Sequence, residues 1–467
     1  AMQFTPVRLG DAGSPRMVLA TVCIAQFMVP FMLTAVGVAL PSLGRDLGAS
    51  AVQLGLVEQL YALALAMSML ACGRLGDIVG QRRVLLPGLA VFTGLTLLVG
   101  LAPSIELVMA LRFGQGIGAA MMLSGSLALV AVAYPPELRG RVIGIVSAFT
   151  YAGLSIGPVL GGYTTDHFGW RSVFLMVVPP GLGATAMCLW RMRPQPGADK
   201  GAHMDWPGSI VYAVSVCMVM TGAARATAVP LGPVLMAAGL VGLVLFLKVE
   251  ERSKSPLLDV NLLLRNRFFS LSCLAAFGNY AAVFGVTFLF SLFLQYAKGL
   301  PPREAGLILL IQPVMQVLTA PLSGRLSDRA DPGRVATVGM LCSAAGLLLA
   351  VLTIAPGMPV WLLAAELVCI GIGFGIFVTA NSVAIMSSVD KAHFGVASGM
   401  VGAMRTLGMA CSMTAVSLIF ALHLGEAAIT PAVLPEFLSA TRTGLAVAAM
   451  FSCLGVLVSV GRGRKRD

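Results

Sequence analysis

Long apolar runs dominate this chain and decide what it can fold into. A helix rises 1.5 Å per residue, so about twenty consecutive apolar residues cross the hydrocarbon core of a bilayer. Fourteen such runs follow one another, each separated from the next by a short polar or charged stretch. We place them at about 17–41, 52–72, 84–103, 105–133, 141–164, 171–192, 207–226, 229–248, 268–296, 304–323, 335–354, 358–386, 395–423 and 437–461. The sequence therefore predicts an all-α membrane protein with about 14 transmembrane helices.

Composition and charge agree with a membrane protein. The 467 residues are 58% hydrophobic and only 11% charged, which no soluble core could absorb. A net charge of +11 would suggest nucleic acid in a soluble protein. Here most Lys and Arg fall in loops or tails on one side of the predicted spans, as the positive-inside rule describes. We expect no nucleic-acid partner and a bacterial-type cytoplasmic membrane location with both termini cytoplasmic.

The nine cysteines lie inside apolar runs and form no CxxC pair. This pattern indicates buried small side chains rather than disulfides or metal ligands. The polar start of the chain precedes a full-length span, so we expect no cleavable signal peptide.

A glycine-rich stretch with charges of both signs joins two of the runs, GRLGDIVGQRRV at 73–84. Glycines at short spacing allow two helix ends to approach with a tight turn between them. A weaker copy, GRLSDRADPGRV, lies at 324–335. The alternative is a generic basic loop, but two copies indicate two similar halves. The residues concerned are Gly73, Asp77, Gly80, Arg82, Arg83 and Asp328.

Together these stretches resemble the loop signature of the major facilitator superfamily of transporters, in which it forms a cytoplasmic gate. The resemblance implies two six-helix bundles, 1–193 and 267–467. The region 194–266 would be a linker with two additional transmembrane helices, apolar all round and lipid-facing. Fourteen helices make the chain similar to the drug:proton antiporter family with that number.

The fourth run carries an arginine two turns from its start, in LRFGQGIGAA at 111–120. On insertion scales, the free energy of placing an arginine at the centre of a membrane helix is unfavourable by about 2.5–3.5 kcal/mol, so Arg112 needs a polar partner or a water-filled cavity. The stretch resembles the family's Arg–Gln–Gly signature, which is associated with proton transfer. The alternative is an arginine that pins helices together by hydrogen bonds.

The fifth run contains GLSIGPVLGG at 153–162. Glycines four residues apart let a neighbouring helix approach closely, and a proline inside a helix kinks it. The stretch resembles the motif that marks antiporters of this superfamily, and it favours export over uptake. A plain packing face is the alternative. The motif residues are Gly153, Gly157, Pro158, Gly161 and Gly162.

Glu58 and Glu366 are the carboxylates well inside predicted spans. Counted from the outer helix ends at 1.5 Å per residue, both lie roughly 9–12 Å deep, in one layer with Arg112. Together with Arg405 they are candidates for proton coupling or substrate binding. Glu58 could instead reach the interface, and Glu366 could make an interhelical hydrogen bond.

Other candidates for a central cavity are polar or soft side chains inside the spans. These are Gln26, Met32, Gln115, Met122, Asn279, Tyr280, Gln312 and Gln316. Interhelical hydrogen bonding is an equal alternative for the polar ones. Met32 stands where similar exporters often carry an acid, in a stretch that otherwise resembles theirs at 34–41.

The chain carries no catalytic or nucleotide-binding motif, so we expect no enzyme and no cofactor, and a proton gradient as the energy source. The resemblance implies a proton-coupled efflux antiporter for drugs or secondary metabolites, working by alternating access. Its partners would be protons, lipid and small lipophilic or cationic substrates, and we expect a monomer. Alternatives are an exporter dedicated to one endogenous product or lipid, a facilitator-type importer, and a non-transporting scaffold or receptor.

Overall fold

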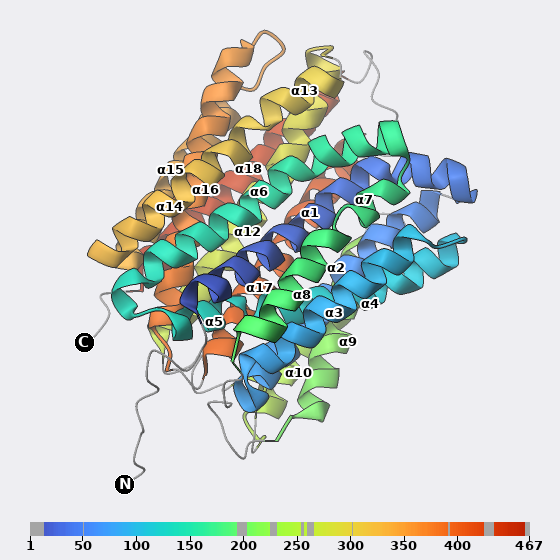
Figure 1. Cartoon of the computed structure of the whole chain (residues 1–467). Coiled ribbons are helices and arrows are strands. Elements are labelled where there is room, and N and C mark those ends of the chain that lie inside the picture. The colour runs from blue at the N-terminus through green and yellow to red at the C-terminus, as the bar shows by residue number, and fades with distance from the viewer. Residues whose placement is uncertain are drawn as a thin grey trace. The chain divides into compact units, whose positions relative to one another are not determined.

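The computed structural model describes residues 14–49, 51–193, 203–224, 231–253, 256–258, 266–300, 302–390, 393–424 and 434–462. All regular elements in these ranges are helices (Figure 1). Within them, 14 segments are long and apolar enough to cross a membrane, which confirms the predicted number of spans.

The helices of the first six spans are α1 (Pro15–Leu47), α2 (Ala51–Val79), α3 (Gln81–Gly100), α4 (Ile105–Ser124) with α5 (Ser126–Ala133), α6 (Pro136–Phe168), and α7 (Arg171–Leu175) with α8 (Val178–Arg191). The helices of the other spans are α9 (Trp206–Ala224), α10 (Leu231–Glu250), α12 (Arg267–Leu292) with the π-helical turn η1 (Phe293–Ala297), α13 (Pro302–Leu309) with α14 (Ile311–Arg329), α15 (Pro332–Thr353), α16 (Val360–Ser387), α17 (Phe394–Leu424) and α18 (Leu434–Val460).

Local sequence explains two of the places where a span divides into two helices. Pro179 and Pro180 lie in the first turn of α8, directly after the break that ends α7. Pro313 lies in the first turn of α14, directly after the break that ends α13. Proline has no backbone N–H and is tolerated in a first turn, where that group would lack a helical partner anyway.

The chain forms two compact units. The first consists of Ala1–Asp205 with Val389–Gly399, and the second of Trp206–Ser388 with Met400–Asp467. In the first unit α1 packs along α6, and α4 packs against both α2 and α3. In the second unit α16 packs against α14 and α15, and α18 packs against α12 and α15.

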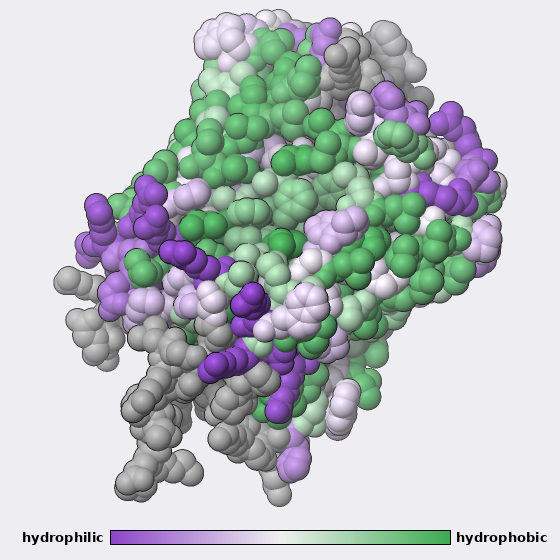
Figure 2. Space-filling model, viewed as in Figure 1, coloured by the Kyte–Doolittle hydropathy of each residue, from purple (hydrophilic) through white to green (hydrophobic). Residues whose placement is uncertain are grey.

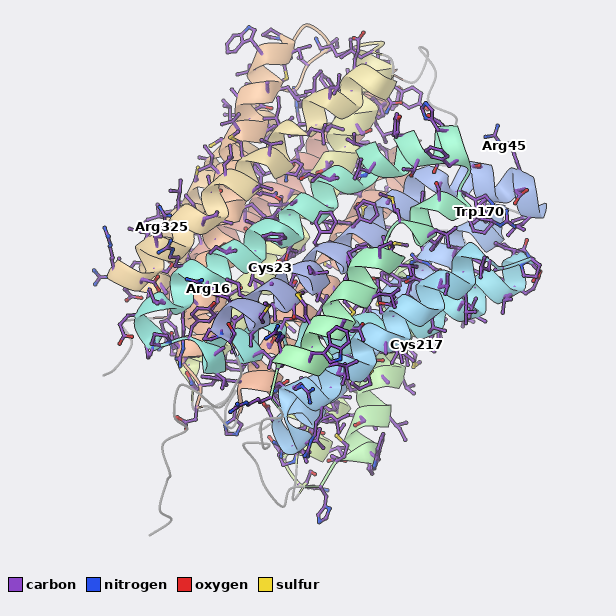
Figure 3. All side chains as sticks on the ribbon, in the orientation of Figure 1. Arg16, Cys23, Arg45, Trp170, Cys217 and Arg325 are labelled. Atoms are coloured by element: carbon purple, nitrogen blue, oxygen red, sulfur yellow. The ribbon has the colours of Figure 1, made fainter. Side chains whose placement is uncertain are left out.

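The helices α9 and α10 pack against each other. Large apolar side chains on α10 are more than half exposed, among them Val241, Val244 and Leu245. Exposed apolar surface on this scale suits contact with lipid rather than water. Figure 2 shows apolar side chains over much of the visible face, while strongly polar ones gather toward helix ends. Arg16 and Arg45 mark the opposite ends of α1 (Figure 3).

Candidate functional site

The stretch predicted as a loop at 73–84 is almost entirely helical. α2 continues through Val79, α3 begins at Gln81, and the turn between them is Gly80 alone, with φ of 102°. A positive φ of this size is accessible to glycine at no steric cost. The glycines therefore permit a one-residue turn, and the charged residues around them are held on helices.

Asp77 caps the start of another helix. Its carboxylate accepts hydrogen bonds from the backbone N–H of Gly395 at 2.7 Å and of Val396 at 2.9 Å, both in the first turn of α17. Gln81 donates a third, at 2.9 Å. Asp77 is only 2% exposed. The free N–H groups and the positive dipole end of a helix stabilise an anion at this position.

Close backbone contact brings the cap together. A Cβ added at Gly73 would lie 2.5 Å from the carbonyl oxygen of Gly395 and 3.5 Å from the Cα of Gly399. Any larger side chain at position 73 would push the start of α17 away from Asp77. The glycines and the acid were visible in the sequence, but the helix that packs against them, α17, was not.

Arg82 and Arg83 make different contacts. Arg82 donates to the backbone carbonyls of Cys188 and Leu189 at 3.1–3.2 Å, at the C-terminal end of α8. A cation suits that end of a helix dipole. Arg83 reaches the carbonyl of Val79, one turn before it, at 3.4 Å. Asp328 of the second copy lies in the last turn of α14.

Arg112 is fully buried on α4. Its guanidinium donates to the carbonyl of Val57 at 3.2 Å and to Oε1 of Gln115 at 2.8 Å, and it lies over the ring of Tyr61 at 4.1 Å. Gln115 in turn donates to the hydroxyl of Thr96 at 2.6 Å. Arg112 therefore does tie α4 to α2, which was the alternative interpretation, yet its Nη2 is buried without a hydrogen-bond partner among the described residues.

Glu58 lies on α2 within electrostatic range of Arg112. Its Oε1 is buried without a hydrogen-bond partner among the described residues. A Cβ added at Gly37 of α1 would come within 2.7 Å of that oxygen, so the carboxyl group points at α1. The first unit thus holds an acidic and a basic side chain inside the span region, each with one polar atom that lacks a hydrogen-bond partner among the described residues.

Glu366 is fully buried on α16 and faces α15. The hydroxyl of Thr353 donates to its Oε1 at 2.5 Å, while Oε2 is buried without a partner in the described part of the chain. The interhelical hydrogen bond considered from the sequence is therefore present. It occupies one of the two carboxyl oxygens.

Tyr280 and Asn279 on α12 have contrasting surroundings. Tyr280 lies within electrostatic range of Arg405 of α17, and its ring meets that of Phe374 edge-on at 5.3 Å. Asn279 is fully buried, and neither of its amide atoms has a partner among the described residues. Each unpaired buried amide atom destabilises the folded protein by about 1–3 kcal/mol, so Asn279 lowers the stability of the fold.

The remaining cavity candidates lie at helix contacts. Gln312 accepts from the hydroxyl of Thr287 at 3.2 Å, and Gln26 accepts from that of Thr150 at 3.0 Å. Gln316 is 6% exposed where α14 meets α16, and Met32 and Met122 are fully buried.

The second unit has a small groove lined by α12, α17 and α18. Its wall is made mainly of small residues such as Ala281, Gly285, Ser412 and Gly444. Asn279 and Tyr280 precede it on α12 and are not part of this wall.

The predicted antiporter stretch forms the contact between α6 and α1. Gly153 and Gly157 face Phe27, Phe31 and Thr34, and a Cβ at Gly161 would lie 2.9 Å from Ala35. Gly162 points elsewhere, with Val38 as its nearest neighbour at 3.5 Å. α6 runs unbroken through Pro158.

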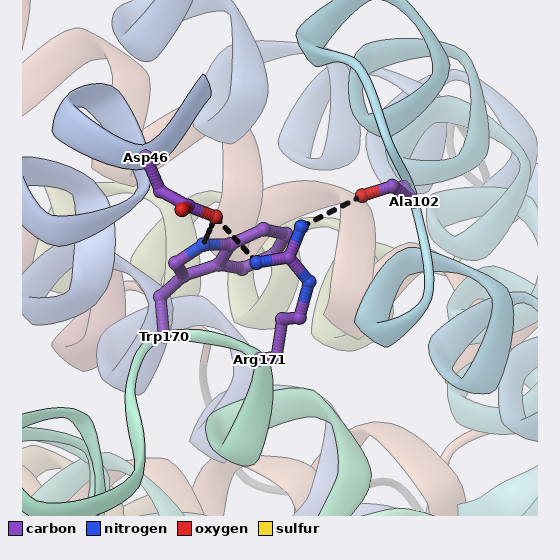
Figure 4. Close-up of polar contacts among 4 residues, drawn as sticks. All are labelled: Asp46, Ala102, Trp170 and Arg171. Atoms are coloured by element: carbon purple, nitrogen blue, oxygen red, sulfur yellow. Dashed lines mark hydrogen bonds and ion pairs between the residues drawn. The ribbon is translucent and has the colours of Figure 1, made fainter. Parts of the chain in front are cut away.

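Sequence reasoning missed a polar cluster at the other end of the first unit (Figure 4). Asp46 accepts from the indole N–H of Trp170 at 2.9 Å and pairs with Arg171, which also donates to the carbonyl of Ala102 at 3.2 Å. The hydrogen bonds from Trp170 and Arg171 lower the pKa of Asp46. The second unit has a related contact, because Arg442 donates to the carbonyl of Ile354 at 3.0 Å. In both units an arginine near the start of the last span thus donates to a backbone carbonyl just beyond a helix, which is α3 in the first unit and α15 in the second.

A second missed cluster surrounds Arg462, just beyond α18. Its guanidinium donates to Asn381 at 2.6 Å, to Ser272 at 3.1 Å and to Ser459. Burial lowers the pKa of Arg462 to about 10, against the opposing influence of Asp331, so the side chain remains charged at neutral pH. The cluster ties α12, α16 and α18 together. The basic tail was visible in the sequence, but its buried partners were not.

Comparison with known proteins finds relatives of similar sequence and a solved structure of the same fold. The riboflavin transporter RibZ of Clostridioides difficile is 27% identical over 96% of this chain and 98% of its own length. The multidrug resistance protein Stp of Mycobacterium tuberculosis is 30% identical over 82% of this chain and 72% of its own length. The human organic anion transporter MFSD10 has the same fold, with a TM-score of 0.68 at 12% identity, covering 98% of this chain and all of its own.

The sequence model of the Major Facilitator Superfamily matches residues 22–413, most of the chain. With 14 candidate membrane helices and this match, the chain is a transporter and not an enzyme, and it belongs to the Major Facilitator Superfamily.

Proposed function

We propose that this transporter is a proton-coupled efflux antiporter for small lipophilic or cationic molecules. The observation that carries the proposal is the pair Glu58 and Arg112 inside the first unit. Each has one buried polar atom without a hydrogen-bond partner among the described residues. Glu366 supplies a comparable unpaired carboxyl oxygen in the second unit.

The chemistry of such carboxyl groups suits coupling. Apolar surroundings favour the neutral, protonated acid, whereas a guanidinium nearby favours the carboxylate. A conformational change that alters either influence therefore changes proton occupancy. Arg112 is held by Val57, Gln115 and Tyr61, so it can remain in place while Glu58 gains or loses its proton.

The contact between α1 and α6 supports export as the direction of transport. Its glycines, which resemble the antiporter motif, bring the two helices into backbone contact and would limit leak through the first bundle. The similarity to a protein named for multidrug resistance also supports export.

Alternating access would use two six-helix bundles, 1–193 and 267–467, with 194–266 as the linker pair. The cap that Asp77 places on the start of α17 would be the cytoplasmic gate. Loss of this cap leaves the first N–H groups of α17 without their anion, which favours opening on that side. Both termini would lie on the cytoplasmic side, as the distribution of Lys and Arg predicts.

Inverted membrane vesicles provide the test. A pH gradient is established, and candidate drugs or dyes are added while the internal pH is followed by a fluorescent amine. Addition of substrate should cause protons to leave vesicles that contain the unmodified protein. Glu58→Gln or Glu366→Gln should abolish or sharply reduce this proton efflux at normal expression. Glu106→Gln is the control, since Glu106 lies at the start of α4 and contacts Gln53 at 3.3 Å in an exposed position. Unchanged proton release from both variants between pH 6 and 8 would refute the proposal.

A second candidate is a transporter dedicated to one endogenous small molecule. Two observations favour it: the relative named as a riboflavin transporter matches nearly the whole chain, and Met32 replaces the acid expected of exporters of cationic drugs. A resistance profile of expressing cells separates the two. Resistance to several unrelated compounds supports multidrug export, while none, together with transport of a single metabolite, supports the dedicated carrier.

A further inference from the structure

Two thiols face each other where α15 packs along α16. The sulfur atoms of Cys342 and Cys369 are 3.6 Å apart. Each sulfur also approaches the backbone carbonyl oxygen of the other residue, at 3.4 Å and 3.2 Å. These reciprocal contacts show that the two residues lie directly opposite each other. All nine cysteines are in the described part of the chain, and among them only this pair brings two sulfur atoms into contact.

Glycines hold the two helices in register on either side of the thiols. A Cβ at Gly339 would lie 2.6 Å from the backbone nitrogen of Phe377, and one at Gly346 would lie 3.2 Å from the Cβ of Cys369. On α16, a Cβ at Gly373 would lie 2.5 Å from the hydroxyl of Ser343. Backbone contact above and below the pair leaves little freedom for the helices to slide or separate.

We propose that Cys342 and Cys369 form an oxidation site that closes to a disulfide linking α15 to α16. A disulfide needs its sulfurs about 2.05 Å apart, so they must approach by about 1.5 Å, within reach of small side-chain rotations. The two thiols lose two protons and two electrons as the S–S bond forms. With the azo compound diamide as oxidant, both protons and both electrons pass to its N=N bond, which becomes a hydrazine.

Partial exposure leaves this pair open to an oxidant. Both residues are half-buried, whereas Cys23, Cys72 and Cys188 are buried. Cys453 is half-buried as well but contacts no other thiol in the described part of the chain, which makes it the matched control. The inference concerns only this thiol chemistry, so it stands or falls independently of the transported substrate.

The placement of methionines provides a direct readout. Cyanogen bromide cleaves after methionine, and Met340, Met358 and Met386 bound two fragments, 341–358 with Cys342 and 359–386 with Cys369. The full-length protein in lipid nanodiscs is treated with diamide, which spares methionine. Remaining thiols are blocked with N-ethylmaleimide, and the protein is cleaved and analysed by mass spectrometry with and without reductant.

We expect the two fragments to remain joined after oxidation and to separate on reduction, with a loss of two free thiols per chain. Cys453→Ala should give the same result, and Cys342→Ala or Cys369→Ala should give no joined fragment. Separate fragments from oxidised protein in which N-ethylmaleimide has alkylated Cys453 would overturn the proposal, because the reagent would then have reached the spans without the pair having closed. Joined fragments in which either cysteine pairs with a different thiol would overturn it equally.

Discussion

The contact between α1 and α6 can be tested with a change of one methyl group. A Cβ added at Gly161 would lie 2.9 Å from three atoms of Ala35, its Cα, Cβ and carbonyl oxygen. Real Cβ atoms essentially never come that close to backbone, so α1 would have to move. At the next residue, Gly162, the nearest atom to an added Cβ is a methyl group of Val38 at 3.5 Å, an ordinary van der Waals contact.

The neighbouring glycine makes the size of the effect calculable. Replacing glycine by alanine inside a helix favours folding by about 1 kcal/mol through backbone entropy, and this applies to both variants. Overpacking a close contact costs about 1–3 kcal/mol and applies to Gly161→Ala alone. The gain in helix propensity is the same for both variants, so it cancels when they are compared. Gly161→Ala should therefore be less stable than Gly162→Ala by about 1–3 kcal/mol.

Two measurements check this expectation. Apparent Tm of the purified protein, followed with a thiol-reactive fluorophore, should be lower for Gly161→Ala than for Gly162→Ala by about 1–3 °C, since the unfolding entropy of a chain of this length makes 1 kcal/mol worth about 1 °C. Relative to the unmodified protein, the Tm of Gly162→Ala should be unchanged or slightly raised. Proton leak into proteoliposomes without substrate should rise for Gly161→Ala alone. Equal Tm and equal leak in the two variants would show that the α1–α6 contact is not as tight as described, and would remove the support it gives to antiport.

Three further predictions concern single residues. Arg462→Ala removes the charged donor of Asn381, which should cost about 1–3 kcal/mol and lower the apparent Tm, with partial recovery in Arg462→Lys; an unchanged Tm would contradict the buried cluster. The lowered pKa of Asp46 means that its carboxylate stabilises the fold above its unfolded pKa of about 3.9 and loses this contribution as pH falls through the lower folded value. Fluorescence of Trp170, with the other tryptophans replaced, should therefore stay constant from pH 8 to 5 and change only below about 4; a change near pH 6 would be inconsistent. Met32→Asp should widen the profile toward divalent cations if α1 lines the cavity, and efficient export of a dication by the unmodified protein would argue against this assignment.

Several candidate residues could be located from the sequence because their cost inside a membrane is visible there. Arg112 and Glu366 were singled out as charges in apolar runs, and both are fully buried. Their roles stay predictions. Which neighbour each one faces depends on the rotation of its helix and on the packing of the next, and periodicity along a single helix does not specify that. The contact between Glu366 and Thr353 on α15 is an example, because it depends on how α15 and α16 pack.

The sequence by itself determined the number of spans and the all-helical class. Backbone groups in lipid must be satisfied within each segment, so every run of about twenty apolar residues becomes a helix regardless of its neighbours. It also determined the close-approach points, since glycine patterns such as 153–162 mark where backbones can touch.

Only the tertiary structure decided which groups meet. Asp77 and Gly395 are 318 residues apart, and nothing local to either indicates that one caps the helix of the other. The same holds for Cys342 and Cys369, which occupied separate apolar runs in the sequence and face each other across one helix contact in the fold. Such pairings follow from how helices of nearly uniform apolar composition pack, and in a membrane that packing is set by small residues and buried polar contacts rather than by a hydrophobic pattern.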